Sequence, residues 1–288
     1  MGLLGAVSTC ALAVRGGFAT AATFRRIAVV DWTIAETMLA MNVVPMAMAE
    51  IPAYCQWVGD PLPPPGVQDL GLRVEPNLEL LAQLKPELIL SSPQFQAASR
   101  QLEAIAPVRF LGVFSEDRRP YDNARRMAAI LGEWCDCPRA AEGLLAFAER
   151  RLLELRARLS AFSGRTLCIV QFVDDRHLRV FDKRSLYSDV LERLSLRNAW
   201  PGDGSTWGFE QAGLEQLLQA PEAMLVVVSP VPPDTLRRLP KSALWQSLPA
   251  VGRNRVLWLP ASWSFGGVPA ALRFAGLLTN ALLGRSSS

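Results

Sequence analysis

Two segments of the chain, 136 positions apart, carry the same pattern of hydrophobic and polar residues. In each, a short leucine-rich stretch with a glutamate precedes a proline, and an apolar run follows that ends in Ser-Pro. The segments span residues 78–93 and 214–230. Each pattern predicts a short amphipathic helix followed by a buried strand of a parallel sheet. A unit that occurs twice at this distance indicates two lobes of similar build, because the units of a solenoid repeat every ~20 to 50 residues.

Strand-like and helix-like stretches alternate around both units. For the first lobe the pattern predicts strands at 27–32, 43–46 and 109–114 and helices at 35–41 and 99–105. For the second lobe it predicts strands at 166–173, 178–181 and 255–259 and a final helix at 269–283. The alternation predicts an α/β fold of two Rossmann-like lobes with mainly parallel sheets. Because small ligands bind in clefts between such lobes, the pattern favours a binding protein.

A long helix is predicted between the two lobes. The chain runs without proline from Pro138, at a first helical position, to Gly164, a C-terminal cap. One apolar stripe follows this stretch at helical spacing, made of Ala148, Leu152, Leu155, Leu159 and Phe162. The helix at 138–164 is therefore predicted to connect a lobe at 23–137 to a lobe at 165–288. A single helical connector of roughly 36 Å limits hinge motion, so the cleft is expected to be largely preformed.

Composition excludes several classes of protein. Half of the residues are apolar and a fifth are charged, which indicates a globular chain with a large core. The net charge of +3, with basic residues scattered along the chain, gives no indication of nucleic-acid binding.

The common catalytic and metal motifs are absent from the sequence. It contains no P-loop, no dinucleotide-binding glycine motif and no Gly-x-Ser-x-Gly. His177 is the single histidine, whereas catalytic zinc sites usually take two or three. Cys135 and Cys137 have the wrong spacing for a C-x-x-C site. We therefore expect no enzyme, no catalytic residues and no metal site of the protein's own.

The N-terminus resembles an export leader in part. Residues 2–14 are apolar and small, and Ala19-Thr20-Ala21 matches an A-x-A cleavage site. The positive residues that usually open such a leader are missing, and Arg15 interrupts the apolar stretch. Residues 1–22 are interpreted as an atypical export leader, with a native N-terminal helix as the alternative.

Several segments resemble a known family. They are residues 71–81, residues 175–181, Asn198–Trp200 followed by Trp207-Gly208, and the stretch from Trp245 to Trp263. In order and over nearly the whole chain, from about residue 27 to 283, they resemble the ferric-hydroxamate (ferrichrome-type) siderophore-binding proteins of bacterial ABC importers. The resemblance implies a periplasmic, monomeric substrate-binding protein with two lobes, one connecting helix and a shallow aromatic cleft. Such a protein delivers a ferric siderophore to an ABC permease in the inner membrane and carries no cofactor.

The resemblance also assigns ligand-binding residues. Arg73 matches the arginine that contacts the hydroxamate oxygens around the iron, a role that suits the several donors of a guanidinium. Trp57, Trp207 and Trp263 match aromatic positions of the cleft. Phe265 matches a further aromatic position, and Phe181 is expected to line the side of the second lobe.

Two positions depart from the family pattern. Phe95 stands where the family has a tyrosine whose hydroxyl supplements the arginine, and Ser91 stands where it has a cleft tryptophan. A lost hydroxyl donor costs on the order of 1 kcal/mol of binding free energy. Either the ligand differs from ferrichrome, or another donor replaces the missing one.

Other cargoes are also compatible with the sequence. Another ferric siderophore, haem or a corrinoid are alternative ligands, and the single histidine disfavours haem. An α/β enzyme lacks support from any motif. For docking on the permease the acidic candidates are Glu103 and either Glu210 or Glu215, although a family docking position is occupied by Arg100.

Overall fold

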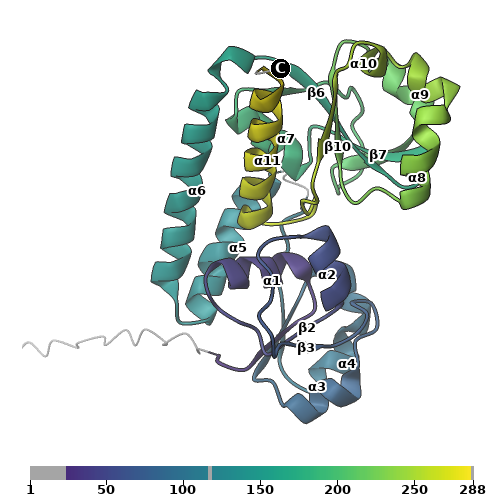
Figure 1. Cartoon of the computed structure of the whole chain (residues 1–288). Coiled ribbons are helices and arrows are strands. Elements are labelled where there is room, and N and C mark those ends of the chain that lie inside the picture. The colour runs from purple at the N-terminus through teal and green to yellow at the C-terminus, as the bar shows by residue number, and fades with distance from the viewer. Residues whose placement is uncertain (1–23, 116–118, 287–288) are drawn as a thin grey trace, which may run out of the picture.

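The chain forms two α/β lobes beside a long helix in a computed structural model that describes residues 24–115 and 119–286 (Figure 1). The predicted two-lobe α/β architecture is confirmed. The proposed leader at 1–22 lies outside the described residues. In the part of the chain that the structure describes, no helix has both the length and the apolar character that crossing a bilayer requires.

The sheet of the first lobe is wholly parallel, as predicted. Its order is β3-β2-β1-β4-β5, formed by β1 (Ile27–Val29), β2 (Ala47–Met48), β3 (Gln68–Asp69), β4 (Leu88–Ser91) and β5 (Val108–Phe110). The connecting helices are α1 (Trp32–Ala40), α2 (Ile51–Trp57), α3 (Leu78–Leu84) and α4 (Ser99–Glu103), with a 3₁₀ segment, η1 (Pro93–Ala98), before α4. The central strands β1 and β4 are buried along their whole length, which explains their uninterrupted apolar runs.

One predicted strand of this lobe is displaced. The strand expected at 43–46 begins at Ala47 instead. Pro45 has no backbone donor, so pairing with β1 starts only at the next residue, where the Met46 amide donates to the Ile27 carbonyl at 2.9 Å.

The sheet of the second lobe mixes parallel and antiparallel pairs. Its order is β11-β10-β6-β7-β9, with β8 (Arg197–Asn198) also paired to β6. The strands are β6 (Thr166–Phe172), β7 (His177–Phe181), β9 (Phe209–Gly213), β10 (Met224–Val228) and β11 (Val256–Leu259). β7 runs antiparallel to β6 and β9, because only a short turn joins it to β6, whereas β10 is parallel to both β6 and β11.

The helices of the second lobe are short. They are α7 (Leu186–Arg193), α8 (Pro233–Arg238), η4 (Leu239–Lys241), α9 (Ala243–Ser247) and α10 (Pro249–Gly252). The second repeated unit differs from the first in one respect: its helix, η3 (Leu214–Gln219), is a 3₁₀ helix where α3 is an α-helix. The strands that follow the two units, β4 and β10, are as predicted.

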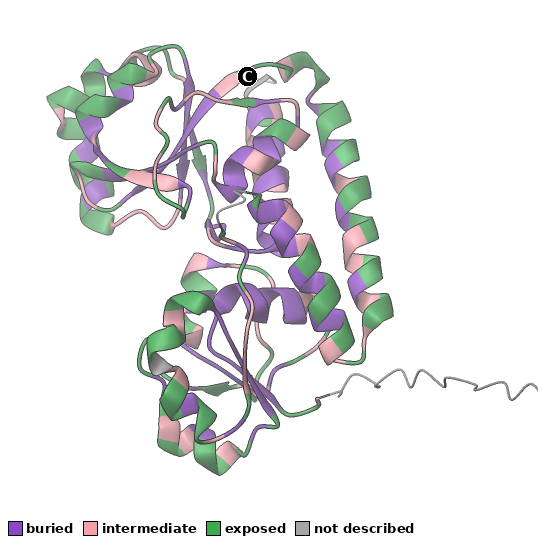
Figure 2. Cartoon of the chain, turned by 180° about the vertical axis from the view of Figure 1, so that it is seen from behind, coloured by how far each residue is buried: buried purple, intermediate pink, exposed green. Residues whose placement is uncertain are grey.

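The predicted connector is α6 (Pro138–Arg158), which begins at the proline as expected and runs along one side of both lobes (Figure 1). It ends earlier than the predicted Gly164. The Leu159 amide donates to both the Leu155 and Arg156 carbonyls, and the chain tightens into a 3₁₀ turn, η2 (Ser160–Phe162). Buried and exposed residues alternate along α6, and its predicted apolar stripe faces inward (Figure 2).

Two further helices lie between α6 and the sheets. α5 (Pro120–Trp134), which the sequence analysis did not predict, packs on α6 and α7. The C-terminal helix α11 (Val268–Ser286) contacts α1, α5, α6 and α7. One continuous apolar core results, and it includes strand residues from both lobes, such as Leu88 of β4 and Val226 of β10. The lobes are therefore joined by shared packing as well as by the connecting helix.

A buried carboxyl group links α1 to the start of α11. Glu36 is fully buried, and its Oε1 accepts a hydrogen bond from the Gly267 amide, while Oε2 has no hydrogen-bond partner among the described residues. Beside it, the Thr33 hydroxyl donates to the Phe265 carbonyl at 2.8 Å. Burial raises the pKa of Glu36 to about 8, and the nearby Asp31 carboxylate adds to the rise. The segment 265–267 is thus held against α1 by two side chains.

The shared core predicts that both lobes unfold together. Phe274 of α11 is fully buried with its ring centroid 4.3 Å from that of Tyr187. We expect Phe274→Ala to lower the free energy of unfolding by about 3–5 kcal/mol in a single urea transition. Leu153→Ala, on the exposed face of α6, is the control and should change it by less than about 0.5 kcal/mol. Separate transitions for the two lobes would contradict a shared core.

The buried Glu36 predicts a stability that falls as pH rises. Between about pH 5 and pH 8 the folded protein keeps a proton on Glu36 that the unfolded chain has lost, so the unfolding free energy decreases across this window. Glu36→Gln stays neutral throughout. Between these two pH values, the free energy of unfolding of the wild type should therefore fall by on the order of 3 kcal/mol relative to that of the variant. Urea titrations at several pH values measure this, and parallel curves for the two proteins would contradict it.

Candidate functional site

A cleft opens between the lobes at the carboxyl ends of the parallel strands, where α/β sheets bind ligands. It consists of three adjoining hollows. The central hollow, of about 400 Å³, is lined by Trp32, Glu50, Ala53, Trp57, Arg73, Gln94, Phe95, Arg179, Trp263 and Phe265. The proline-walled hollow, of about 330 Å³, shares Trp57 and Arg179 with it and adds Gln171 and Pro230–Pro233 among others. The inner hollow, of about 50 Å³, shares Gln94 and Phe265 with the central one.

The guanidinium of Arg73 lies over the ring of Trp32 in the central hollow. Its central carbon is 3.6 Å from the ring centroid of Trp32, and its Nε donates to Glu50 Oε2 at 2.8 Å. The rings of Phe95 and Trp263 lie 5.6 and 5.7 Å away. Within the described residues, the two terminal nitrogens of Arg73 donate no hydrogen bond, so they remain available to a ligand.

A folded loop after β3 sets the direction of Arg73. Gly71 has a φ of 72° and forms a bridge with Pro76, which closes the loop 71–76. The Glu50 amide donates to the Gly71 carbonyl at 2.7 Å, so the same residue holds the loop by its backbone and the guanidinium by its side chain. Glu50 itself adopts a left-handed φ of 53° at the start of α2, a conformation that non-glycine residues rarely take.

Tryptophan rings form the wall around this guanidinium. The Trp263 ring lies between those of Trp32 and Trp57, at centroid distances of 5.0 and 6.2 Å and with steep interplanar angles. Trp57 is the last residue of α2, and Trp263 lies between β11 and α11. The Trp32 indole nitrogen donates to the Ala49 carbonyl at 2.9 Å, which fixes the ring on which Arg73 stacks.

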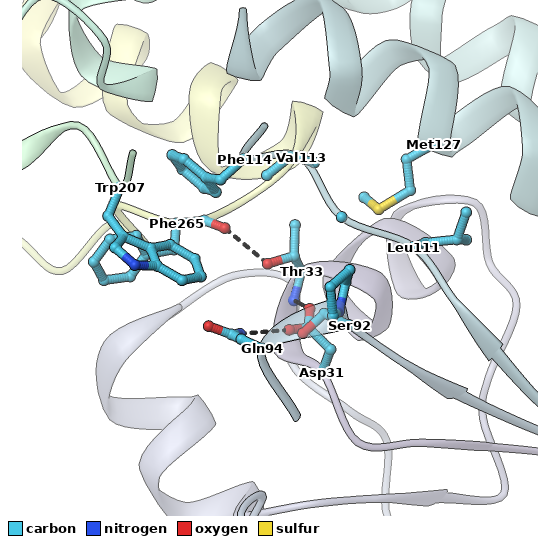
Figure 3. A pocket seen from close by; sticks show the side chains of 12 residues that line it. Asp31, Thr33, Ser92, Gln94, Leu111, Val113, Phe114, Met127, Trp207 and Phe265 are labelled. Atoms are coloured by element: carbon cyan, nitrogen blue, oxygen red, sulfur yellow. Dashed lines mark hydrogen bonds between the residues drawn. The ribbon is translucent and has the colours of Figure 1, made fainter. Parts of the chain in front are cut away.

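The aromatic wall continues into the inner hollow. Phe265 lies 5.2 Å from Trp263, 5.7 Å from Phe114 and 6.0 Å from Trp207, measured between ring centroids. Figure 3 shows Phe114, Trp207 and Phe265 gathered at one end of this hollow. Below them, Asp31 caps α1 and accepts a hydrogen bond from the Gln94 amide nitrogen at 3.0 Å.

Trp207 depends on a neighbouring glycine for its position. Gly208 has a φ of 72°, and a Cβ there would lie 2.5 Å from the Ser185 Cα. Only glycine fits this close approach, which brings the loop before β9 against the start of α7.

The structure brings most of the predicted site residues together. Five of them line the central hollow: Arg73, Trp57, Trp263, Phe95 and Phe265. Trp207 lines the inner hollow and is joined to the others through Phe265. Ser91 is fully buried at the end of β4 and lines none of the three hollows.

Phe181 is the exception. Its ring is fully buried, packs on Tyr187 and Phe209 at centroid distances of 4.8 and 6.3 Å, and lines none of the three hollows. On β7, Arg179 and Phe181 share one face of the strand, but α7 covers only Phe181. The residue of this face that reaches the cleft is therefore Arg179, and the expectation for Phe181 is corrected.

Several lining residues were not predicted from the sequence. They are Trp32, Glu50, Gln94, Phe114 and Arg179. The first four share one signal, because each ends a predicted strand of the first lobe or stands four residues after one, at the edge where parallel strands end. Arg179 had a weaker signal, a charged residue inside an apolar strand.

The lining offers flat aromatic faces and guanidinium donors. Among the described residues there is no group of three or more His, Cys, Asp or Glu side chains arranged to hold a metal ion. Such a surface can cover the organic part of a chelate and donate hydrogen bonds to its oxygens.

Comparisons with known proteins agree with this architecture. The family model for periplasmic binding proteins matches residues 27–262. The iron(3+)-hydroxamate-binding protein FhuD of Escherichia coli is 31% identical over 91% of this chain and 88% of the relative. The Fe(3+) dicitrate-binding periplasmic protein FecB of the same species is 27% identical over 90% of this chain and 85% of the relative.

A solved structure matches the whole fold. The siderophore-binding protein FhuD from Vibrio cholerae, bound to Fe³⁺-Desferal, has a TM-score of 0.83 at 31% identity and covers 90% of this chain and 97% of that one. The family that the sequence resemblance predicted is thereby confirmed. Since both the family match and the relatives extend over most of its length, the chain belongs to the periplasmic binding protein family and is a substrate-binding protein, with no catalytic role.

Proposed function

We propose that this protein binds a ferric hydroxamate siderophore in the interlobe cleft and delivers it to an ABC permease in the inner membrane. In this proposal it acts in the periplasm as a monomer, and iron enters only as part of the chelate. The observation that carries the proposal is the Arg73 guanidinium, stacked on Trp32 inside an aromatic hollow. The similarity of this chain to the iron(3+)-hydroxamate-binding protein of Escherichia coli and to the siderophore-binding protein of Vibrio cholerae supports it.

The chemistry of the central hollow suits such a chelate. Hydroxamate oxygens bound to ferric iron keep acceptor capacity, and the terminal nitrogens of Arg73 can donate to them. Stacking on Trp32 and the bond to Glu50 hold the guanidinium in place, so little side-chain entropy is lost when a ligand binds. Trp57 and Trp263 offer flat faces to the organic backbone. A volume of about 400 Å³ falls within the usual range of small-molecule sites.

Haem is less well supported as the cargo. His177, the single histidine, is the exposed first residue of β7, where its Nδ1 is 2.9 Å from Asp174 Oδ2. It lines none of the three hollows. A haem iron in the cleft would find no imidazole ligand there.

Docking on the permease is proposed to use exposed acidic residues on both lobes. Glu103 is exposed at the end of α4 and Glu215 is exposed on η3. Glu210 is a poorer candidate than the sequence indicated, because it is half-buried and accepts a hydrogen bond from the Trp200 indole. Arg100 is exposed on α4, close to Glu103 in sequence.

The proposal predicts tight binding that depends on Arg73. Titration of the purified protein with a ferric hydroxamate should quench its tryptophan fluorescence at about micromolar ligand or below, since three tryptophans line the central hollow. Arg73→Ala should weaken binding by about tenfold or more, because donors to the chelate are lost. Arg197→Ala, an exposed arginine on β8, is the control and should bind as the wild type does. No quenching by any ferric hydroxamate would reject the function, and unchanged affinity of Arg73→Ala would reject this contact.

A second prediction concerns Phe95, whose ring lies near Arg73 but carries no donor. Phe95→Tyr adds a hydroxyl at the rim of the central hollow. If the cargo presents hydroxamate oxygens there, affinity for ferrichrome should rise by about fivefold, the effect of one hydrogen bond worth about 1 kcal/mol. The same titration measures this, with Phe147→Tyr on the exposed face of α6 as the matched control. A loss of affinity would show that the ligand packs on the Phe95 ring edge instead.

A further inference from the structure

Arg179 stands where two hollows of the cleft meet. It lies in the middle of β7, opposite Gln171 of β6 and Gln211 of β9 in the strand register. Its side chain lines both the central and the proline-walled hollow, and its guanidinium carbon is 5.4 Å from the ring centroid of Phe209. A ligand that fills the central hollow and extends past Trp57 must pass this guanidinium.

Arg179 differs from the other charged residues of the cleft in having no partner. Asp31 accepts hydrogen bonds from the Thr33 amide and from Gln94, and Arg73 is paired with Glu50. Across residues 24–115 and 119–286, Arg179 makes no ion pair and no side-chain hydrogen bond, and its Nε is buried without an acceptor. The residues opposite it on both neighbouring strands are neutral glutamines.

An unpaired and partly buried cation is costly. Burial lowers the pKa of Arg179, because the charged guanidinium has lost part of its hydration. A carboxylate that entered the hollow would restore the lost interactions, and the planar fork of a guanidinium matches a carboxylate with two parallel hydrogen bonds.

A second polar group is unsatisfied beside it. Gln171 is 2% exposed and lines the proline-walled hollow. Its Nε2 donates a long hydrogen bond of 3.4 Å to the Ser229 carbonyl, while its Oε1 has no partner among the described residues. Because Oε1 is an acceptor, it suits an N–H donor on the chain of a ligand and not the carboxylate itself.

We infer that the cargo is an anionic ferric hydroxamate that carries a pendant carboxylate, and that Arg179 binds this carboxylate. The inference rests on the proposed function and makes it more specific. Arg73 contacts the hydroxamate oxygens at one side of the central hollow, and Arg179 receives the acidic arm where the cleft continues toward Pro230–Pro233.

Two forms of one ligand test the charge preference. Desferrioxamine B carries a terminal amine that can be acetylated, which leaves it neutral, or succinylated, which adds a carboxylate. Both ferric complexes have the same iron centre and the same flexible chain. At low salt we expect the wild type to bind the succinylated complex at least about tenfold more tightly than the acetylated one, because its carboxylate forms charge-assisted hydrogen bonds with Arg179. The preference should shrink with added salt.

Variants of Arg179 separate its role from a structural one. Arg179→Gln should bind the succinylated and acetylated complexes with equal affinity, so that the preference is lost. Binding of the acetylated complex, which offers no carboxylate, should persist and so report an intact fold. Arg179→Lys keeps the charge and should retain part of the preference. Arg176→Gln, an exposed arginine on the turn before β7, is the control and should leave the preference unchanged.

The outcomes distinguish the two proposals. If neither ferric complex binds, the proposed function fails and this inference fails with it. If both bind with equal affinity, or if Arg179→Gln keeps the full preference, ferric hydroxamate binding stands and the role of Arg179 is overturned.

Discussion

The apolar core that runs through both lobes is the constraint on which the site depends. Helices α5, α6 and α11 fill the space behind the two sheets, and their buried residues form one cluster with strands of each lobe. Flexible strands between lobes allow closure over a ligand, whereas shared packing resists it. The cleft walls are therefore expected to keep their spacing without a ligand, which suits a cargo of defined size.

The same constraint explains how aromatic residues from distant segments can share one hollow. Trp263 and Phe265 precede α11, and Glu36 and Thr33 of α1 hold this segment through Gly267 and Phe265. The segment lies between the wall of the first lobe, with Trp32 and Trp57, and that of the second, with Trp207. A buried carboxyl group is a costly means of attachment, but it is directional, which apolar packing is not.

Charge is divided unevenly between the two lobes. The first lobe contributes Arg73 with its partner Glu50, a pair whose charges largely cancel. The second lobe contributes Arg179, which has no acidic partner in the described part of the chain. A neutral chelate can accept hydrogen bonds from Arg73 alone, whereas a cargo with a carboxylate can also pair with Arg179. Selectivity among ferric siderophores is thus proposed to reside in the second lobe.

The sequence alone determined the elements whose signals are local. The duplicated helix-strand unit, the proline start of α6 and its apolar stripe predicted two lobes and one connector, because burial periodicity and proline geometry act within one segment. The resemblance around Arg73 and the tryptophans predicted residues that now share a cleft. The sequence did not indicate α5, the early end of α6 or the 3₁₀ form of η3, which depend on neighbouring packing and on competing hydrogen bonds.

Only the tertiary structure decided which residue of β7 faces the cleft. Alternation along a strand places Arg179 and Phe181 on the same face. The sequence could therefore assign the face, but not the residue at which packing against other segments stops and the cleft begins. Tyr187 of α7 and Phe209 of β9 bury Phe181, and the cleft begins two residues earlier at Arg179. That boundary is set by contacts between segments distant in the sequence, which no local pattern encodes.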